Sequence, residues 1–310
     1  MPLLRRKSTL LAKIETTYGT DAAPTGSANA ILVANLTATP IESEYVDRDL
    51  IRAYLGASEQ LPAAIHAQLE FDCEVAGSGA AGTAPAWGPL LRACGFAETV
   101  TPGVKVEYKP VSSGFESATL YFNLDGVLHK LLGARGTVSI AMSARERPLF
   151  RFRFVGLYVA VADAAAPTTD YTAWKRPLPV NKVNTPTLSL HGYAGAVMSE
   201  LSIDAGVSPV YRSLVGAERV DITDRQMTGS ITLEAVTVAT KDWWSAVRDA
   251  TLGSLQLVHG TASGNKVQLD APAVQLTTPR YADLDGVAML SMAMRLLPSA
   301  GNDELTITAL

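Results

Sequence analysis

The sequence predicts a mainly β protein built from two tandem β-sandwich or β-barrel domains, each with a flanking short α-helix. A short motif occurs twice, as RAYLGA at residues 52–57 and as RSLVGA at residues 212–217. Apolar and polar residues alternate along many short segments, which is typical of strands with one buried face. A tryptophan also occurs in each half, at equal spacing from an aliphatic residue and an arginine. Because an internal period indicates repeated architecture, we interpret the halves as copies of one folding unit.

The expected elements follow the same order in both halves. Alternating strands are predicted at residues 65–75 and 231–235. Each is followed by a short helix that carries the tryptophan, Trp87 with Leu91 and Arg92, and Trp243 with Val247 and Arg248. Further strands are predicted at residues 119–122, 137–140 and 149–155 of the first half, and at residues 254–257, 273–276 and 287–296 of the second.

Composition places the domain boundaries between these elements. We expect an N-terminal arm at residues 1–30, a first β domain at 31–162 with an inserted hairpin at about 97–117, a connector at 163–186, and a second β domain at 187–310. Residues 18–29 are too small and polar to bury much surface, so we expect an extended arm that becomes ordered on a neighbouring subunit. The prolines of the connector make it semi-rigid.

Length and charge limit the kinds of partner. A chain of 310 residues with 47% hydrophobic residues can bury two sizeable cores, and 18% charged residues is low for a monomer, which indicates surface buried against partners. With 30 acidic and 26 basic residues, the chain lacks the positive excess of a nucleic-acid binder. Because no segment resembles a signal peptide or a membrane span, we expect synthesis in the cytoplasm. Cys73 and Cys94 fit no disulfide or metal framework, and we expect both to be buried.

The search for chemistry gives no catalytic, cofactor or metal site. His66, His129, His191 and His259 are scattered, with no second ligand at metal-binding spacing. The acidic clusters Glu42, Glu44, Asp47 and Asp49, and Asp221 with Asp224, lie in polar stretches and are interpreted as solvated faces. The glycine-rich segment 77–82 lacks the Gly-Lys-Ser/Thr ending of a phosphate loop and is interpreted as a flexible turn. We therefore expect neither an enzyme nor a metal protein.

One segment superficially resembles a nucleic-acid platform. Residues 150–154 read FRFRF, so a strand there has a phenylalanine face and an arginine face. Since the rings and the charges lie on opposite faces, we expect the phenylalanines in the core. We expect Arg151 and Arg153 to contact carboxylates of another subunit.

Three segments together resemble a known family. They are KIETTYGTDAAPT at residues 13–25, LSLHGY at 188–193 and TDRQMTGSI at 223–231. With them the chain resembles the tail tube proteins, also called major tail proteins, of long non-contractile-tailed bacteriophages (siphophage type), and the likeness extends over most of the chain. The family has no catalytic residues to transfer.

The resemblance implies a structural subunit of the virion tail, made in the host bacterial cytoplasm. Single-domain relatives form hexameric rings, so a duplicated subunit would form trimers with pseudo-sixfold symmetry around a lumen for DNA during genome ejection. The implied partners are the ring neighbours and stacked rings, the tape measure protein inside the tube, and the tail terminator and distal tail proteins. Double-stranded DNA would pass transiently and without sequence specificity, and no membrane partner is implied. Independently, a ring would pair the open edges of a β domain with those of its neighbours.

Two alternative functions remain open at this stage. One is the tube protein of a contractile phage tail or of a related secretion or injection system. The other is a β-sandwich carbohydrate-binding or adhesion module, which would expose aromatic platforms. Only 7% of the residues are aromatic, which disfavours that module.

Overall fold

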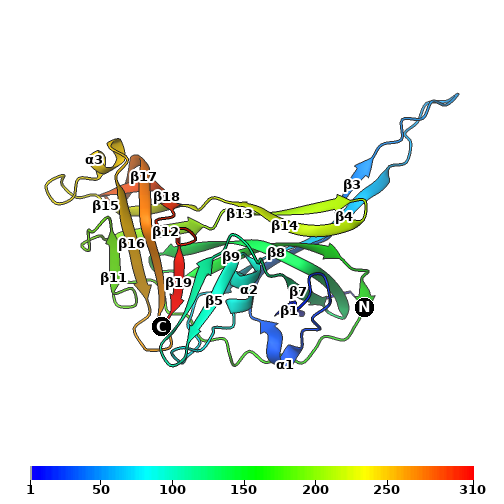
Figure 1. Ribbon diagram of the computed structural model, residues 1–310, viewed down its shortest axis with the longest axis horizontal. Coiled ribbons are helices and arrows are strands. Elements are labelled where there is room, and N and C mark those ends of the chain that lie inside the picture. The colour runs from blue at the N-terminus through cyan, green and yellow to red at the C-terminus, as the bar shows by residue number, and fades with distance from the viewer. Residues whose placement is uncertain (1) are drawn as a thin grey trace.

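The computed structural model describes residues 2–310 as a β-rich molecule with three short helices (Figure 1). The predicted mainly β fold with short flanking helices is confirmed. Apolar and polar residues alternate along many segments, and this pattern favours strands with one buried face. The helices are α1 (Gly26–Asn29), α2 (Gly88–Ala93) and α3 (Trp243–Arg248). The strands of the first half are β1 (Ser8–Ile14), β2 (Ala30–Ile31), β3 (Ala34–Val46), β4 (Leu61–Glu74), β5 (Phe96–Thr101), β6 (Lys105–Pro110), β7 (Ala118–Leu124), β8 (Val127–Ser143), β9 (Leu149–Tyr158) and β10 (Ala162–Asp163). Those of the second half are β11 (Thr187–Leu190), β12 (Met198–Asp204), β13 (Val207–Leu214), β14 (Ala217–Arg225), β15 (Thr228–Glu234), β16 (Leu252–His259), β17 (Val267–Leu284), β18 (Val287–Leu297) and β19 (Thr306–Ala309).

The antiparallel strands form two runs. In the first the order is β1-β7-β8-β9-β4-β3. In the second it is β11-β16-β17-β18-β15-β12. The runs are joined where β12 pairs with β8, and again where β19 pairs with both β6 and β17. The result is one continuous 17-stranded sheet system, with β13 and β14 forming a separate hairpin.

Period-two alternation decides which face of each strand is buried. On β9 the rings of Phe150, Phe152 and Phe154 are at most 2% exposed, whereas Arg151 and Arg153 are on the opposite face. The predicted burial of the phenylalanines is confirmed. Arg153 contacts Glu70 of the same chain at 3.4 Å, so this arginine already has an intrachain partner.

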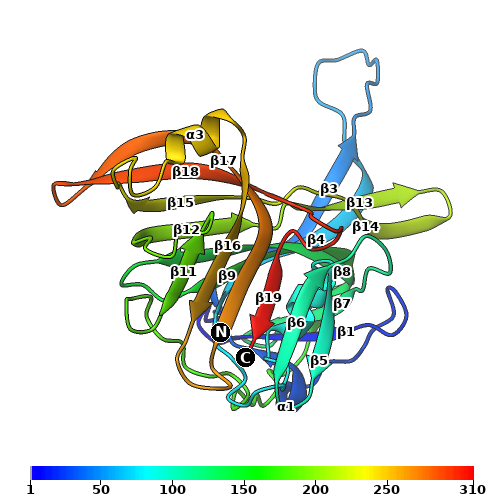
Figure 2. The ribbon, with the colours of Figure 1, turned by 60° about the vertical axis from the view of Figure 1, so that its left-hand side comes forward.

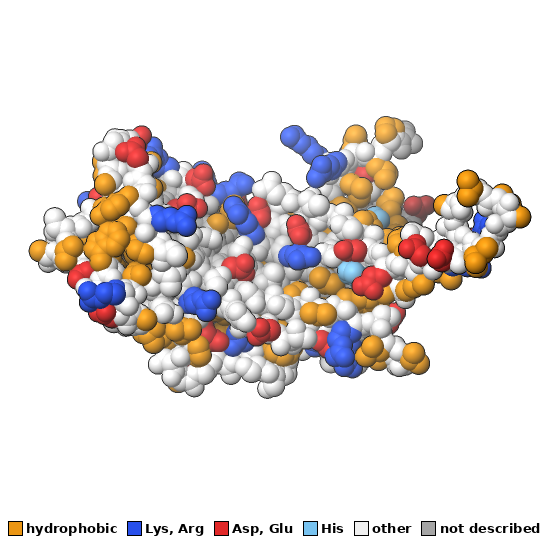
Figure 3. Space-filling view, turned by 90° about the horizontal axis from the view of Figure 1, so that it is seen from above, with side chains coloured by type: hydrophobic (Ala, Val, Ile, Leu, Met, Phe, Trp, Pro, Cys, Tyr) orange, Lys and Arg blue, Asp and Glu red, His pale blue; other side chains and the backbone are white. Residues whose placement is uncertain are grey.

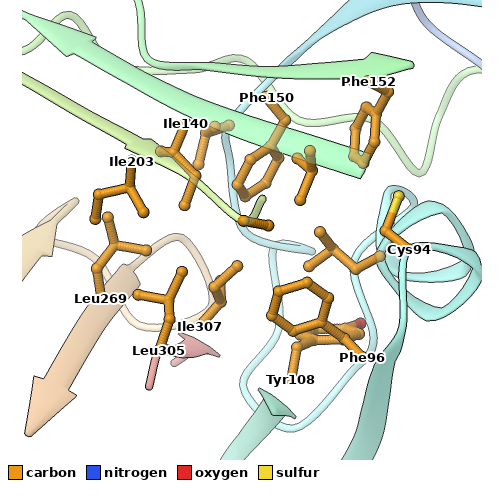
Figure 4. Close-up of a cluster of buried hydrophobic side chains, with 14 of the residues drawn as sticks. Cys94, Phe96, Tyr108, Ile140, Phe150, Phe152, Ile203, Leu269, Leu305 and Ile307 are labelled. Atoms are coloured by element: carbon orange, nitrogen blue, oxygen red, sulfur yellow. The ribbon is translucent and has the colours of Figure 1, made fainter. Parts of the chain in front are cut away.

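The buried side chains form one cluster rather than two separate cores (Figure 4). Ile140 and Phe150 of the first half face Ile203, Leu269 and Ile307 of the second half across this cluster. The length and the repetition of the sequence suggested two cores. These features contain no information about contacts between the halves, so the single cluster could not be predicted from them. The β12–β8 and β19–β6 pairings bring the two apolar faces together.

The N-terminal segment is built into its own chain, which differs from the expected arm. Strand β1 lies between β7 and β2, and Leu10 is fully buried. Residues 18–29 are then held by local contacts, among them Ala22 N–H to the Thr119 hydroxyl at 3.0 Å and the Asp21 carboxylate to Lys130 at 3.0 Å. These contacts are long-range in sequence, so composition alone could not predict them.

The connector and the hairpin near residue 100 also pack against the body. Trp174 in the connector donates through Nε1 to the Ala30 carbonyl at 2.9 Å, and Val180 is 3% exposed. A hairpin is present as β5 and β6, and Val106 and Tyr108 of β6 are fully buried. Along residues 2–310, the structure contains no helix with the length and apolarity that crossing a membrane requires.

Candidate functional site: open sheet edges and hairpins

The four histidines occupy separate structural positions. His66 stacks on Tyr211 with ring centroids 4.8 Å apart, and His129 lies against Phe122. His191 Nε2 donates to the Val274 carbonyl at 2.8 Å. No group of three or more potential metal ligands is found among residues 2–310.

His259, the last residue of β16, forms hydrogen bonds with the connector. The side chain is 3% exposed, with Nε2 3.1 Å from the Leu178 carbonyl and Nδ1 2.9 Å from the Thr185 hydroxyl. Burial lowers the pKa of His259, and it does the same for His129 and His191. At neutral pH these imidazoles are therefore mainly in the neutral form in the folded chain.

The chain is expected to lose stability on acidification. Because the pKa of His259 is lower in the folded state than in the unfolded state, the unfolded chain binds the extra proton first. The stabilisation is complete above about pH 6.5, the ordinary histidine pKa, and is lost as the pH falls through the folded-state value. Urea unfolding between pH 7.5 and pH 5 should show this loss, with a shallower slope in His259→Gln. An equal slope in both proteins would contradict the assignment.

The acidic residues and the glycine-rich segment have structural surroundings. Glu42, Glu44, Asp47 and Asp49 are exposed along β3 and the loop after it, as expected of a solvated face. Asp221 lies 2.8 Å from Arg219, and this hydrogen bond lowers the pKa of the Asp221 carboxyl. Asp224 accepts from the Arg225 N–H at 2.8 Å. The segment at 77–82 contacts the loop between β16 and β17, where the Gly79 N–H donates to the Gly264 carbonyl at 2.8 Å.

Unpaired sheet edges are the main feature left without a partner in the described chain. Along its length β3 pairs only with β4, so its other edge has no neighbouring strand among residues 2–310. Over Arg280–Leu284, β17 pairs with β18 and, within the same described range, with no second strand. These edges lie at opposite ends of the molecule in two views (Figures 1 and 2). An open edge offers unpaired N–H and C=O groups to another strand.

Two hairpins extend from the sheet, and each has one of the repeated motifs at its tip. We call β13–β14 the docked hairpin because it packs across β8 and β9 of the first half (Figure 1). We call residues 40–65 the free hairpin; it comprises the outer parts of β3 and β4 with the loop between them, and it projects from the body. Its tip exposes apolar side chains, and among them Ile51 and Leu55 are fully exposed. Val215, at the tip of the docked hairpin, is also fully exposed.

A compact set of contacts fixes the docked hairpin. Val220 is fully buried, its N–H donates to the Tyr18 hydroxyl at 2.6 Å, and its carbonyl accepts from Arg135 at 2.7 Å. The Arg135 guanidinium lies 4.9 Å from the centre of the Tyr18 ring and 3.8 Å from Asp221. Burial raises the pKa of Tyr18. Sequence reasoning missed this set, because Tyr18, Arg135 and Val220 are far apart in the chain and have no shared motif.

The face of the sheet opposite the core is polar between these features. Its side chains come from β3, β4, β8, β9 and β12 and line a shallow depression; they include Thr37, Glu70, Asp72, Thr137, Ser139, Arg151, Arg153 and Asp204. Figure 3, viewed onto this side, shows charges of both signs interspersed across the middle, with apolar side chains gathered toward the two ends. The arginines therefore lie among carboxylates and do not form a purely basic patch.

Comparison with protein families shows which family the chain belongs to. A family model described as phage tail tube protein matches residues 5–294. The chain therefore belongs to the phage tail tube protein family, and the resemblance stated from the sequence is confirmed at that level. A search of curated proteins found no match. The family assigns a structural role in the virion tail, in which copies of the subunit assemble into a tube with other tail components.

Proposed function

We propose that three copies of this chain close a ring with pseudo-sixfold symmetry, and that stacked rings enclose a lumen through which DNA passes during genome ejection. In this proposal residues 31–162 and 187–310 are two copies of one tube domain, linked by the connector at 163–186. The observation that supports it best is the common order of the two strand runs, β1-β7-β8-β9-β4-β3 and β11-β16-β17-β18-β15-β12. Each run would occupy one of six similar positions around the axis.

The positions of the open edges support a closed ring. A contact between different surfaces of identical chains is head-to-tail, and it closes if the rotation per subunit divides the circle. The edge of β3 and the edge of β17 at Arg280–Leu284 lie at opposite ends of the molecule, as such a contact requires. Pairing them would also remove two exposed edges that otherwise promote aggregation.

The polar sheet face is the proposed lining of the lumen. DNA must slide past the wall, so the wall must not hold phosphates through unpaired lysine or arginine side chains. On this face Arg153 lies 3.4 Å from Glu70 and 3.0 Å from the Gln68 amide oxygen. Asp72 and Asp204 add negative charge nearby. The same lining would contact the tape measure protein before ejection, and the ends of the tube would meet the tail terminator and distal tail proteins.

Electron microscopy of the purified protein tests the proposed assembly. We expect rings or tubes with threefold-averaged subunits, six similar lobes and a central channel. Particles without a channel, or a chain that stays monomeric at all concentrations, would overturn the proposal.

Replacing Leu55 and Val215 together by serine is expected to leave rings intact but shorten the tubes. Both side chains are fully exposed at hairpin tips, so we assign them to contacts between stacked rings. Burying such a side chain contributes about 1.5–3 kcal/mol. Losing two per chain should raise the concentration needed for stacking by about a hundredfold or more, at 1.4 kcal/mol per factor of ten.

Tube length in negative-stain micrographs measures this effect. The matched control is Val183→Ser, because Val183 is 73% exposed but lies in the connector. Tubes of wild-type length from the Leu55→Ser, Val215→Ser protein would remove the tips from the stacking contact.

A further inference from the structure

The junction between the two strand runs provides a template for the contact between chains. Strand β12 of the second run pairs with β8 of the first, with Ser202 opposite Ala141, Ile203 opposite Ile140 and Asp204 opposite Ser139. This strand closes the edge of its own run and at the same time extends the neighbouring run. A contact of the same kind between two chains would form the proposed ring, on which this inference rests.

Strand β3 occupies the place in the first run that β12 occupies in the second. Gln68 of β4 is paired with β9 at the position where Thr228 of β15 is paired with β18, so these two residues correspond. Strand β3 pairs with β4 in the same register as β12 pairs with β15, and Thr37 therefore corresponds to Ser202. The alignment also matches Ala38 with Ile203. Over this segment both strands have the same alternation, with Leu36 and Ala38 of β3 directed to the core and Thr37 directed away from it.

Burial differs between the two strands in the way a missing neighbour requires. Leu201 and Ile203 on β12 are fully buried. Their counterparts on β3, Leu36 and Ala38, contact the core but are only partly buried. The difference indicates that β3 lacks a strand which β12 has, namely the segment of β8 at Ser139–Ser143.

The counterpart of that β8 segment is Arg280–Leu284 of β17. Ile140 pairs with Phe150 of β9, and Tyr281 pairs with Leu290 of β18 at the matching position. Ile140, with β12 paired beside it, is 2% exposed, whereas Tyr281 is 68% exposed and has the ring of Trp244 beside it, with the ring centroids 5.5 Å apart. The exposed aromatic pair therefore lies where a further strand would cover it.

We propose that β3 of one chain pairs antiparallel with Arg280–Leu284 of β17 in a second copy, in the register of the internal β12–β8 pair. Thr37 is then opposite Ala282, Ala38 opposite Tyr281 and Thr39 opposite Arg280. The free hairpin, which continues β3 and β4, lies across β17 and β18 of that second copy, as the docked hairpin lies across β8 and β9 within the chain. The same junction thus occurs alternately within and between chains around the ring.

A cysteine pair tests the register directly. Thr37 and Ala282 are exposed, so Thr37→Cys with Ala282→Cys should fold normally. Opposite residues on antiparallel strands have Cβ atoms about 4.5–5.5 Å apart, close enough for a disulfide after a small adjustment. Mild oxidation of assembled rings should shift the chain from monomer to covalent dimers and trimers on a non-reducing gel. The native Cys73 and Cys94 will not interfere, because both are buried and burial raises the pKa of each thiol.

Two matched pairs control the experiment. Ser202→Cys with Ala141→Cys places the same geometry within one chain, so oxidation should consume both thiols while the chain still runs as a monomer on the gel. Thr39→Cys with Leu284→Cys is displaced from the proposed register by four residues, roughly 13 Å along the strand, and should not cross-link.

The outcomes separate this inference from the proposed function. Cross-linked dimers and trimers from the Thr37, Ala282 pair alone would support the register. Rings that form without this cross-link, or that cross-link equally through the displaced pair, would overturn the register and leave the ring in place. A protein that forms no rings by microscopy, and no cross-linked species, would overturn both.

Discussion

Replacing Trp87 by alanine is expected to lower the free energy of unfolding by about 3–5 kcal/mol, the usual cost of removing a large buried aromatic side chain. Trp87 is 1% exposed and lies at the start of α2. Its indole Nε1 donates to the Ala76 carbonyl at 2.8 Å, and its ring centre is 5.1 Å from those of Tyr108 and Phe150. The truncation therefore opens a cavity and also leaves a buried carbonyl without its donor.

Urea unfolding of the isolated chain measures the Trp87→Ala effect, with tryptophan-independent circular dichroism as the signal. Trp244→Ala is the matched control, because this substitution removes the same side-chain volume, but Trp244 is 37% exposed and its ring lies against the exposed Tyr281. We expect a much smaller loss for this variant. Equal losses for both tryptophans would show that Trp87 does not anchor α2 on the sheet.

Local patterns in the sequence predicted the elements whose structure is set locally. The FRFRF segment predicted a strand with buried rings, because alternation alone decides which side faces the core. The spacing around Trp87 and Trp243 predicted two short helices, and both are present at Gly88–Ala93 and Trp243–Arg248. The β-rich fold followed from many such segments.

Contacts between distant segments were not predictable in the same way. The merged core depends on β19 pairing with β6, which joins residues about two hundred positions apart. The docked hairpin depends on Arg135 donating to the Val220 carbonyl and on the Tyr18 hydroxyl accepting from the Val220 N–H, and none of these residues is unusual in its local sequence. The repeated motifs at residues 52–57 and 212–217 were visible, but only the structure places both at hairpin tips.

The N-terminal segment illustrates why composition misled. Small and polar residues at 18–29 indicate a chain that cannot fold alone, which is correct for the isolated segment. Here the segment follows β1, whose Leu10, Leu11 and Ala12 are buried, and it is therefore delivered to a surface of its own chain. Burial of the preceding strand supplies the free energy that the segment itself lacks.

Replacing Glu15 by leucine is expected to destabilise the folded chain by about 2–6 kcal/mol. Glu15 is 8% exposed and directly follows β1, and its two carboxylate oxygens accept four hydrogen bonds. They come from the backbone N–H groups of Gly19 and Gly133 at 2.8 and 2.7 Å, and from the hydroxyls of Ser117 and Thr119 at 2.7 and 2.9 Å. Leaving two buried backbone donors unpaired costs about 1–3 kcal/mol each, which sets the estimate before the hydroxyls are counted.

The substitution should first loosen the segment after Glu15 and only then lower the stability of the whole chain. The reason is that Glu15 lies where the chain leaves β1 and enters the segment that contains Tyr18. Limited proteolysis between residues 15 and 29, together with urea unfolding, measures both parts. Glu15→Gln keeps one acceptor oxygen and should lose less stability, whereas Glu44→Leu removes an exposed carboxylate from β3 and should change little. Since Tyr18 accepts from Val220, loss of the Glu15 contacts should also loosen the docked hairpin and weaken the proposed ring assembly. A Glu15→Leu protein with wild-type unfolding and wild-type protease resistance would contradict this chain of contacts at its first step.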